Sequence, residues 1–350
     1  MAVGGDAFVG RELELGVLHG RLERALAGAG SLVMVAGEAG IGKTRTLGEF
    51  AAAARARGAL TLWGSSFEGD WHPPYGPWVE ALGDAVRSVD PARLRQALGR
   101  GAPVLARLLP ALDDTLGEAA AVASLSPDEE RFRLFDAVAQ FLVDVAGWQP
   151  VVLVLDDLHW TDRDSLQLLA YCGRFVGRAP LVLVGAYREG PPDLHPGYPL
   201  LDTLAVLGRE ASYERLGLGG LSRGEVADYL ARANGQELPA PLVAAIHGES
   251  GGNPFYVRQL WRHLVDERVV VRQHGRWVLA AELGHAGVPH GVRHLVARRL
   301  GRLSAAAGGA LRSAAALTAG FDFAILQTIT GLPEEVLLGC LDEAVGAGLI

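Results

Sequence analysis

Lysine, cysteine and long apolar runs are all scarce in this chain of 350 residues, and each scarcity excludes a class of protein or site. The two cysteines, Cys172 and Cys340, lie far apart in sequence, which excludes a cysteine-based zinc site and suits a reducing compartment. No apolar run approaches the ~20 residues that a membrane span requires, and the first residues carry no export signal. We therefore expect a cytoplasmic protein without a membrane partner, folded into two or three compact units.

Lysine occurs once, at position 43, and the other 31 of the 32 basic residues are arginine. This lysine belongs to the segment GEAGIGKT (37–44), which fits the phosphate-binding pattern G-x-x-x-x-G-K-[ST]. An apolar, β-branched run at 31–36 precedes the segment, and an alanine-rich helical stretch at 45–57 follows it. A chance glycine-rich turn is the alternative in a chain with 46 glycines, but the flanking strand and helix favour a phosphate site.

The residue types in this turn suit an anion. Glycines let successive backbone N–H groups point inward, at the positive end of the new helix. Lys43 would reach the β- and γ-phosphates of a nucleotide, and the Thr44 hydroxyl would hold Mg²⁺. A compact ammonium fits this space, whereas a broad guanidinium does not. The predicted nucleotide-binding residues of the turn are Gly37, Glu38, Ala39, Gly40, Ile41, Gly42, Lys43, Thr44 and Arg45.

An acidic pair follows a second apolar run, about 110 residues downstream. Residues 151–155 are all apolar, which is typical of a strand buried on both faces, and Asp156 and Asp157 follow directly. In this context they fit a Walker B motif: Asp156 should hold the hydrated Mg²⁺, and Asp157 should orient or activate the attacking water. Adjacent acids on one strand would point to opposite sides. An acidic turn after a core strand is the alternative, and a packing role is favoured for His159 and Trp160.

A third apolar run, at 181–187, ends in Arg188. In P-loop ATPases with an extra strand between the two Walker strands, this place senses the γ-phosphate, which an arginine can contact at two points. A surface arginine at a strand end is the alternative. With further strands at 59–64 and 213–216, these runs predict an α/β fold. It would contain a five-stranded parallel sheet of the P-loop NTPase type, with helices on both faces, complete by residue 218.

The chain beyond residue 218 reads as mostly helical. A capping box at Ser222 opens predicted helices at 222–234, 239–248 and 254–266, which would form a lid, and a β-hairpin follows. Predicted helices at 289–303, 304–318, 322–330 and 333–347 resemble a winged-helix bundle that ends before its wing, as in a fragment. We therefore expect a P-loop ATPase domain (1–218), a helical lid with hairpin (219–285) and a partial winged-helix domain (286–350).

Five segments together resemble a known family: FVGRE (8–12), GEAGIGKT (37–44), LVLDDLHWTD (153–162), LVGAYRE (183–189) and GGNPFYV (251–257). The set is similar to the STAND branch of the AAA+ P-loop ATPases, in particular the amino-terminal ATPase half of large ATP-binding LuxR-type transcriptional regulators. The resemblance implies that Val9 and Arg11 lie over the nucleotide base and that Pro254 of the lid closes over the adenine. It also implies an ATP/ADP switch whose ATP form self-associates.

The resulting expectation is an ATP-binding module that depends on Mg²⁺ and hydrolyses ATP slowly. Two alternatives stay open: a nucleic-acid-binding ATPase of the origin-recognition type, and the ATPase module of a nucleotide cyclase. The first rests on residues 251–312, whose ten arginines and three acids give +7, against −15 elsewhere. In LuxR-type regulators the DNA-binding helix-turn-helix lies carboxyl-terminal to everything matched here, so we do not expect DNA binding by this chain.

Overall fold

The computed structural model describes residues 8–67, 73–109, 112, 126–189, 198–273, 276–279, 303–315 and 323–346. They divide into two compact units. The sheet unit comprises residues 11–39 and 43–218, and the helical unit comprises residues 1–10, 40–42 and 219–350.

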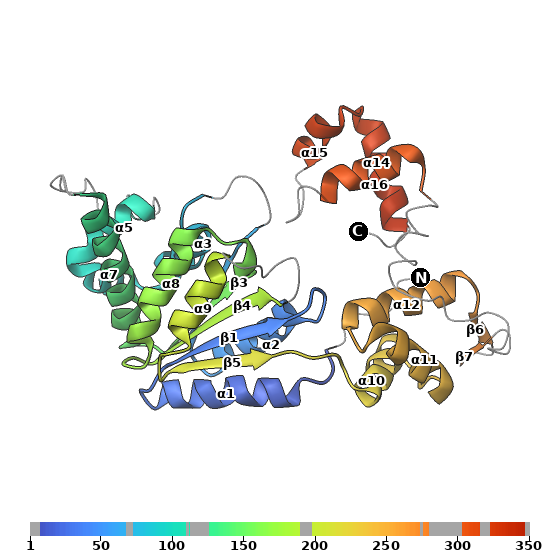
Figure 1. The fold of residues 1–350 in the computed structure, drawn as a ribbon, viewed down its shortest axis with the longest axis horizontal. Coiled ribbons are helices and arrows are strands. Elements are labelled where there is room, and N and C mark those ends of the chain that lie inside the picture. Colours follow the sequence, from blue (N-terminus) through green and yellow to red (C-terminus); the bar gives the residue numbers. More distant parts are fainter. Residues whose placement is uncertain are drawn as a thin grey trace. The chain divides into compact units, whose positions relative to one another are not determined.

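Five parallel strands form the centre of the sheet unit, as the sequence predicts (Figure 1). In chain order they are β1 (Ser31–Gly37), β2 (Leu60–Ser65), β3 (Val151–Asp156), β4 (Leu181–Arg188) and β5 (Tyr213–Gly217). In space the order is β2-β3-β4-β1-β5, so β4 lies between the strands that carry the two motifs. The register pairs Gly37 with Arg188, and Ser65 with Asp156. The motif residues therefore lie at one edge of the sheet, the carboxyl edge.

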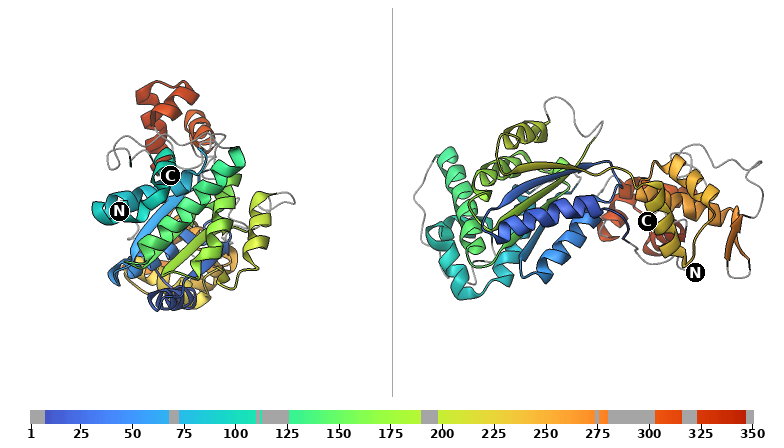
Figure 2. Two further views of the ribbon diagram at one scale, coloured as in Figure 1. Left: turned by 90° about the vertical axis from the view of Figure 1, so that its left-hand side faces the viewer. Right: turned by 90° about the horizontal axis from the view of Figure 1, so that it is seen from below.

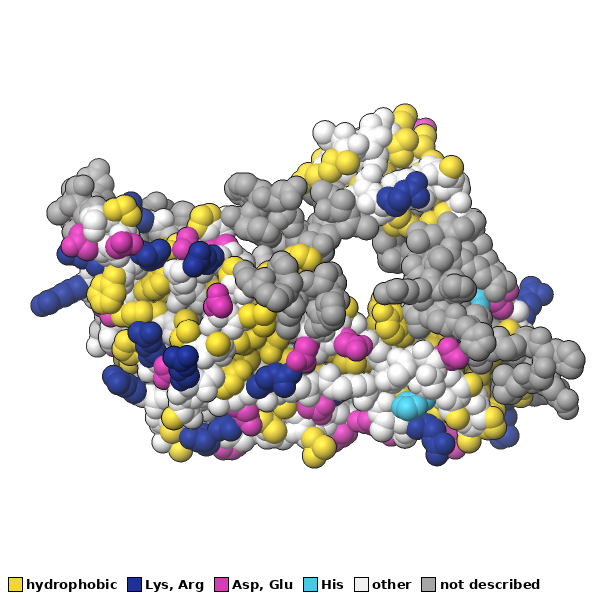
Figure 3. Space-filling model, viewed as in Figure 1, with side chains coloured by type: hydrophobic (Ala, Val, Ile, Leu, Met, Phe, Trp, Pro, Cys, Tyr) yellow, Lys and Arg dark blue, Asp and Glu magenta, His cyan; other side chains and the backbone are white. Residues whose placement is uncertain are grey.

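Helices cover both faces of this sheet (Figure 2). One face carries α1 (Glu12–Leu26) and α2 (Lys43–Ala56). The other carries α3 (Gly76–Ser88), α7 (Pro127–Ala146), α8 (Arg163–Val176) and α9 (Pro199–Leu207). Leu32 and Met34 of β1 belong to the core on the second face, and all of β1 is buried because helices cover both sides. On the face shown in Figure 3, arginine and acidic side chains are interspersed over the sheet unit.

A helical insert follows β2 and α3. It contains α4 (Pro91–Leu98), a 3-10 turn η1 (Gly99–Gly101) and α5 (Ala102–Leu108). Pro103 lies in the first turn of α5, where a missing N–H costs nothing. Gly99, which ends α4, has a φ of +45°, and this conformation favours glycine.

The helical unit begins with the predicted lid helices. They are α10 (Arg223–Asn234), α11 (Ala240–Ser250) and α12 (Pro254–Asp266), followed by an antiparallel pair, β6 (Val270–Gln273) and β7 (Arg276–Leu279). Three further helices, α14 (Ala305–Ala315), α15 (Phe323–Thr330) and α16 (Glu334–Gly346), share a small core of their own. The predicted helix at 289–303 lies almost entirely outside the described residues, and the three-part division of the chain stays a prediction.

Within the described ranges, no single helix is long and apolar enough to cross a bilayer. The α15 helix and residues 334–344 pass that test only as a pair, by length and composition, and they are bent by 109°.

A close approach between β2 and α3 gives a test of this packing. A Cβ added at Gly64 would lie 1.8 Å from the Pro77 carbonyl oxygen, so Gly64→Ala must push the two elements apart. We expect it to lower the free energy of unfolding by about 1–3 kcal/mol. Gly48→Ala is the control, because Gly48 lies exposed in α2 and no neighbouring atom is within 4 Å of an added Cβ. That substitution should stabilise the chain by about 0.5–1 kcal/mol. Urea unfolding followed by tryptophan fluorescence measures both, and equal midpoints for the two variants would contradict the packing described.

Candidate functional site

The segment 37–44 forms the turn between the end of β1 and the start of α2. Gly40 and Gly42 have φ angles of +75° and +99°, which side chains with a Cβ rarely adopt. The turn can therefore curl tightly in front of the positive end of α2. Arg45, in the first turn of α2, is exposed and forms an ion pair with Glu49, with 3.1 Å between the charged atoms.

Lys43 is held inside this turn. Its ammonium donates hydrogen bonds to the carbonyl oxygens of Gly37, at 2.9 Å, and Glu38, at 3.0 Å, and the side chain is 6 % exposed. The Gly37 carbonyl also accepts the N–H of Glu189, at 3.2 Å, just beyond β4. The carbonyl groups of the first two residues of the turn thus hold the ammonium beside the carboxyl edge of the sheet.

The two motifs meet at Asp156. This last residue of β3 is 2 % exposed, and its carboxylate accepts the N–H of Asp157, at 2.8 Å. Burial raises the pKa of Asp156, while the Thr44 side chain, the N–H of Asp157 and the charge of Lys43 lower it, which means that Thr44 and Lys43 lie near the carboxylate. The structure thus brings Lys43, Thr44 and Asp156 together as the sequence predicts.

Asp157 does not continue the strand. Its backbone is left-handed, with φ 53° and ψ 40°, and β3 ends at Asp156. The expectation that the two acids point to opposite sides of one strand is therefore wrong, because the second acid already belongs to a turn. Its side chain is 39 % exposed. Burial and the nearby charge of Asp156 raise the pKa of Asp157 to about 6, although Arg188 and Lys43 oppose the shift.

Arg188 lies at the end of β4, close to this turn. Its guanidinium carbon is 5.7 Å from the ring centroid of Trp160, in the 3-10 turn η3 (Leu158–Trp160). Its charge lowers the pKa of Asp157 and of His159, which places it near both. The contact between Arg188 and Trp160 could not be predicted from the sequence, because only the fold brings β4 beside η3. The sequence offered one indication, which is that Trp160 belongs to the string LDDLHW directly after the acidic pair.

Of the remaining predicted residues, Val9 and Pro254 belong to the helical unit and Arg11 to the sheet unit. Val9 is 9 % exposed, and Arg11, the residue before α1, is 5 % exposed with a φ of +70° and an ion pair to Glu14 at 3.0 Å. Pro254 is the first residue of α12, and the side-chain oxygen of Asn253 caps that helix by accepting the Phe255 N–H, at 3.1 Å. The helix start is as expected, while contacts of these residues with a nucleotide base stay a prediction.

The groups at the carboxyl edge fit a phosphate bound with Mg²⁺. The Thr44 hydroxyl and the Asp156 carboxylate are hard oxygen ligands, and the Lys43 ammonium would face the phosphate charge. Across the described residues, no group of three His, Cys, Asp or Glu side chains could hold a metal ion. A cation at Thr44 and Asp156 would therefore need phosphate oxygens and water as further ligands, which is how Mg²⁺ commonly binds.

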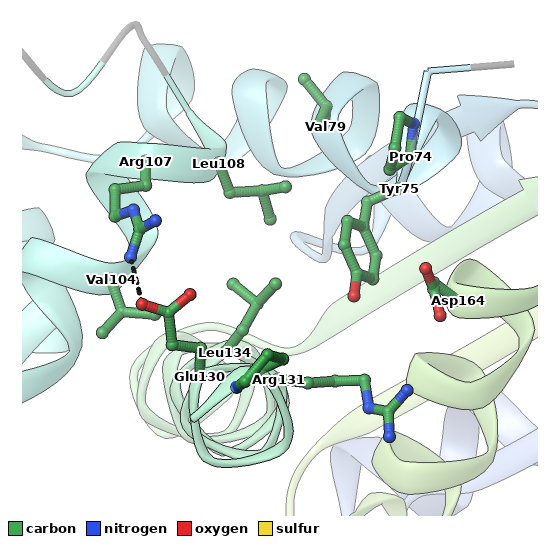
Figure 4. A pocket seen from close by; sticks show the side chains of 11 residues that line it. Pro74, Tyr75, Val79, Val104, Arg107, Leu108, Glu130, Arg131, Leu134 and Asp164 are labelled. Atoms are coloured by element: carbon green, nitrogen blue, oxygen red, sulfur yellow. Dashed lines mark hydrogen bonds and ion pairs between the residues drawn. The ribbon is translucent and has the colours of Figure 1, made fainter. Parts of the chain in front are cut away.

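A hollow of about 540 Å³ lies elsewhere in the sheet unit, between α3, α5 and α7 (Figure 4). Its walls are apolar side chains such as Val79 and Leu134, and an ion pair of 3.3 Å joins Arg107 to Glu130 at its side. It contains none of the residues that the motifs predict. The charged cluster at the carboxyl edge is therefore the better candidate site, despite the volume of this hollow.

Comparisons with known proteins agree with this geometry. The family model described as "AAA ATPase domain" matches residues 7–184. An uncharacterised protein of Rhizobium meliloti (strain 1021) is 28% identical over 193 residues, which cover 53% of this chain and 19% of that protein.

Two solved structures are similar to this chain. One is a signal transduction ATPase with numerous domains (STAND) from Pyrococcus horikoshii, with a tetratricopeptide repeat sensor. It is 15% identical to this chain and has a TM-score of 0.54, and the match covers 97% of this chain and 40% of that one. The other is the ORC1 protein of Aeropyrum pernix in complex with DNA, with 20% identity and a TM-score of 0.41 over 98% and 85% of the two chains.

This chain spans about a fifth of the length of the curated relative and two fifths of the STAND chain. At 15% identity, the likeness to the STAND chain shows the fold alone. The family model matches half of the residues, across both motifs and the first half of β4. The chain therefore belongs to the AAA ATPase domain family, which confirms the AAA+ part of the resemblance read from its sequence.

Proposed function

We propose that this chain is the Mg²⁺-dependent ATP-binding module of a STAND-type signal-transduction ATPase. It hydrolyses ATP slowly in the cytoplasm and serves as the ATP/ADP switch of a LuxR-type transcriptional regulator. The observation that carries the proposal is the proximity of Thr44 and of the Lys43 charge to the buried carboxylate of Asp156. A cation site would then lie directly beside a phosphate site.

Each residue then has a defined task. The backbone N–H groups of the glycine turn and Lys43 bind the β- and γ-phosphates, while Thr44 and Asp156 hold Mg²⁺, which when bound neutralises phosphate charge. Asp157 orients the attacking water and accepts its proton. Arg188 contacts the γ-phosphate, and Val9, Arg11 and Pro254 face the base. The guanidinium of Arg188 rests over Trp160 in this structure.

A switch needs an element with two positions, and Arg188 supports that part of the proposal. Its guanidinium contacts the Trp160 ring here, at 5.7 Å, and a γ-phosphate would compete for the same cation. The ATP and ADP forms would therefore differ in where this arginine lies. In this proposal the chains associate with one another in the ATP form.

The nucleic-acid alternative has less support. It rests on the arginine-rich segment 251–312, of which residues 280–302 lie outside the described residues. On the visible face of the sheet unit, basic and acidic side chains are mixed, without the continuous basic surface that duplex DNA would favour (Figure 3). If the chain were retained on a DNA column and the retention weakened with added salt, this alternative would gain support.

Substitution of the single lysine tests the phosphate site. Lys43→Ala should abolish binding of a fluorescent ATP analogue with the circular dichroism spectrum unchanged. Lys43→Arg should be nearly as damaging, because two carbonyl oxygens within 3.0 Å enclose the ammonium and leave no room for a guanidinium. Arg55→Lys is the control, since Arg55 lies exposed near the end of α2, where its guanidinium donates hydrogen bonds to the Thr61 hydroxyl. Wild-type affinity in Lys43→Arg would refute the steric argument.

The two acids should fail in different ways. Asp156→Asn should weaken MgATP binding more than binding of metal-free ATP, because it removes a ligand of the cation. Asp157→Asn should retain MgATP binding and reduce single-turnover hydrolysis by ~10²–10⁴-fold, as expected for loss of a general base. In size-exclusion chromatography with ATP, Asp157→Asn should also stay in the associated form. Normal hydrolysis by Asp157→Asn together with normal MgATP binding by Asp156→Asn would contradict both assignments.

A further inference from the structure

His159 is buried without the hydrogen bonds that a buried imidazole normally makes. Its side chain is 1 % exposed, and among the described residues neither ring nitrogen has a hydrogen-bond partner. An unpaired buried polar group costs about 1–3 kcal/mol, and folded proteins pair nearly all such groups. Because this ring lies in the turn directly after the acidic pair, its missing partners need a functional explanation.

The acid that the proposed reaction uses lies close to this ring. The Nδ1 atom of His159 lies 3.8 Å from Oδ1 of Asp157, which is too long for a hydrogen bond. A movement of about 1 Å would bring the pair to hydrogen-bonding distance. The Asp157 side chain is 39 % exposed and has room to rotate, whereas the imidazole is enclosed. The carboxylate is therefore the partner that moves.

The turn itself is fixed against the sheet. Leu158 packs over Gly185 of β4, so closely that a Cβ on Gly185 would lie 2.6 Å from its side chain. The Trp160 ring lies 4.9 Å from the imidazole and also contacts Arg188. Asp157, His159, Trp160 and Arg188 thus form a continuous row of contacts. This row joins the two groups that are proposed to face the γ-phosphate.

The imidazole is neutral at physiological pH. Burial and the positive charges of Arg188 and Lys43 lower the pKa of His159 to about 3. A neutral imidazole has one N–H donor and one acceptor nitrogen. It can therefore orient a carboxylate by hydrogen bonding while leaving the negative charge of that carboxylate in place.

We propose that His159 is a positioning residue for Asp157. When a nucleotide fills the glycine turn, Nδ1–H of His159 donates to one oxygen of the Asp157 carboxylate and fixes the rotamer in which the other oxygen faces the attacking water. The distance of 3.8 Å between Nδ1 of His159 and Oδ1 of Asp157 in this structure then represents the pair before a nucleotide binds. This inference rests on the proposed ATPase function and adds to it a residue that makes no contact with the nucleotide.

A histidine that merely fills the core would leave the hydrolysis rate unchanged when it is replaced. Replacing a buried, unpaired polar group by an apolar one of similar volume is nearly neutral or stabilising. Leucine at position 159 should then give a protein at least as stable as the wild type and equally active. Stability is therefore expected to be the same in both cases, and the hydrolysis rate distinguishes them.

The test compares His159→Leu with His159→Asn, whose side-chain amide keeps a donor near the place of Nδ1. Both should bind the fluorescent ATP analogue with wild-type affinity, with Lys43→Ala as the non-binding control. His159→Leu should keep or raise the unfolding temperature and slow single-turnover hydrolysis about 10- to 100-fold. The smaller asparagine leaves a cavity and should lower the unfolding temperature, yet it should retain more of the hydrolysis rate. The order of the two variants in stability is then the reverse of their order in rate.

A double-mutant cycle tests whether His159 acts through Asp157. Adding His159→Leu to Asp157→Asn should cause no further loss of rate, because the positioned carboxylate is already gone. A wild-type rate in His159→Leu, a rate in His159→Asn as low as in His159→Leu, or additive losses in the cycle would each overturn the proposal. A wild-type chain that binds no ATP would refute the proposed function, and this inference with it, whereas the other outcomes leave that function intact.

Discussion

The close approach of Thr44 and Lys43 to the buried carboxylate of Asp156 is the interaction on which the site depends. It brings the first turn of α2 to the end of β3, two strand positions away from β1 in the sheet. A carboxylate that is 2 % exposed would be strongly disfavoured in its charged form without such partners. Thr44, the N–H of Asp157 and the charge of Lys43 favour the charged form, although burial still raises the pKa of Asp156. The phosphate turn and the cation ligand are therefore coupled, since two residues of the turn act on the charge of Asp156.

Much of this arrangement could be predicted from sequence, because it follows from local patterns. The apolar run before Asp156 is continuous since β3 is covered on both faces, and a run of that kind identifies a central strand. The glycines of residues 37–44 are needed for left-handed backbone, which the segment itself encodes. The left-handed turn at Asp157 could not be predicted, because an aspartate gives no such signal and the packing of Leu158 on Gly185 sets the turn. The burial of His159 beside Trp160 depends likewise on contacts between distant parts of the chain.

Several departures from ordinary folding rules lie at the same edge of the sheet. They are a non-glycine residue with positive φ, two buried charged groups and an imidazole whose nitrogens have no hydrogen-bond partner among the described residues: Asp157, Lys43, Asp156 and His159. A fold tolerates local costs only where the surrounding structure is well determined, and such costs concentrate at functional sites. Single departures of these kinds also occur elsewhere, as at Tyr75 and Ser31, but the carboxyl edge combines them, which favours it over the hollow as the candidate site.

The unique lysine has a physical explanation in the same terms. Arginine serves well at the exposed positions of this chain, where ion pairs such as Arg45–Glu49 form in water and the shape of the cation matters little. At position 43 the cation must donate to two carbonyl oxygens of its own turn, at 2.9 and 3.0 Å, with almost no exposure to solvent. An ammonium presents three donors around one atom, whereas a planar guanidinium spreads five donors over a fork that this turn cannot enclose. A chain in which arginine replaces lysine at every other basic position therefore has a steric reason to keep lysine at this one.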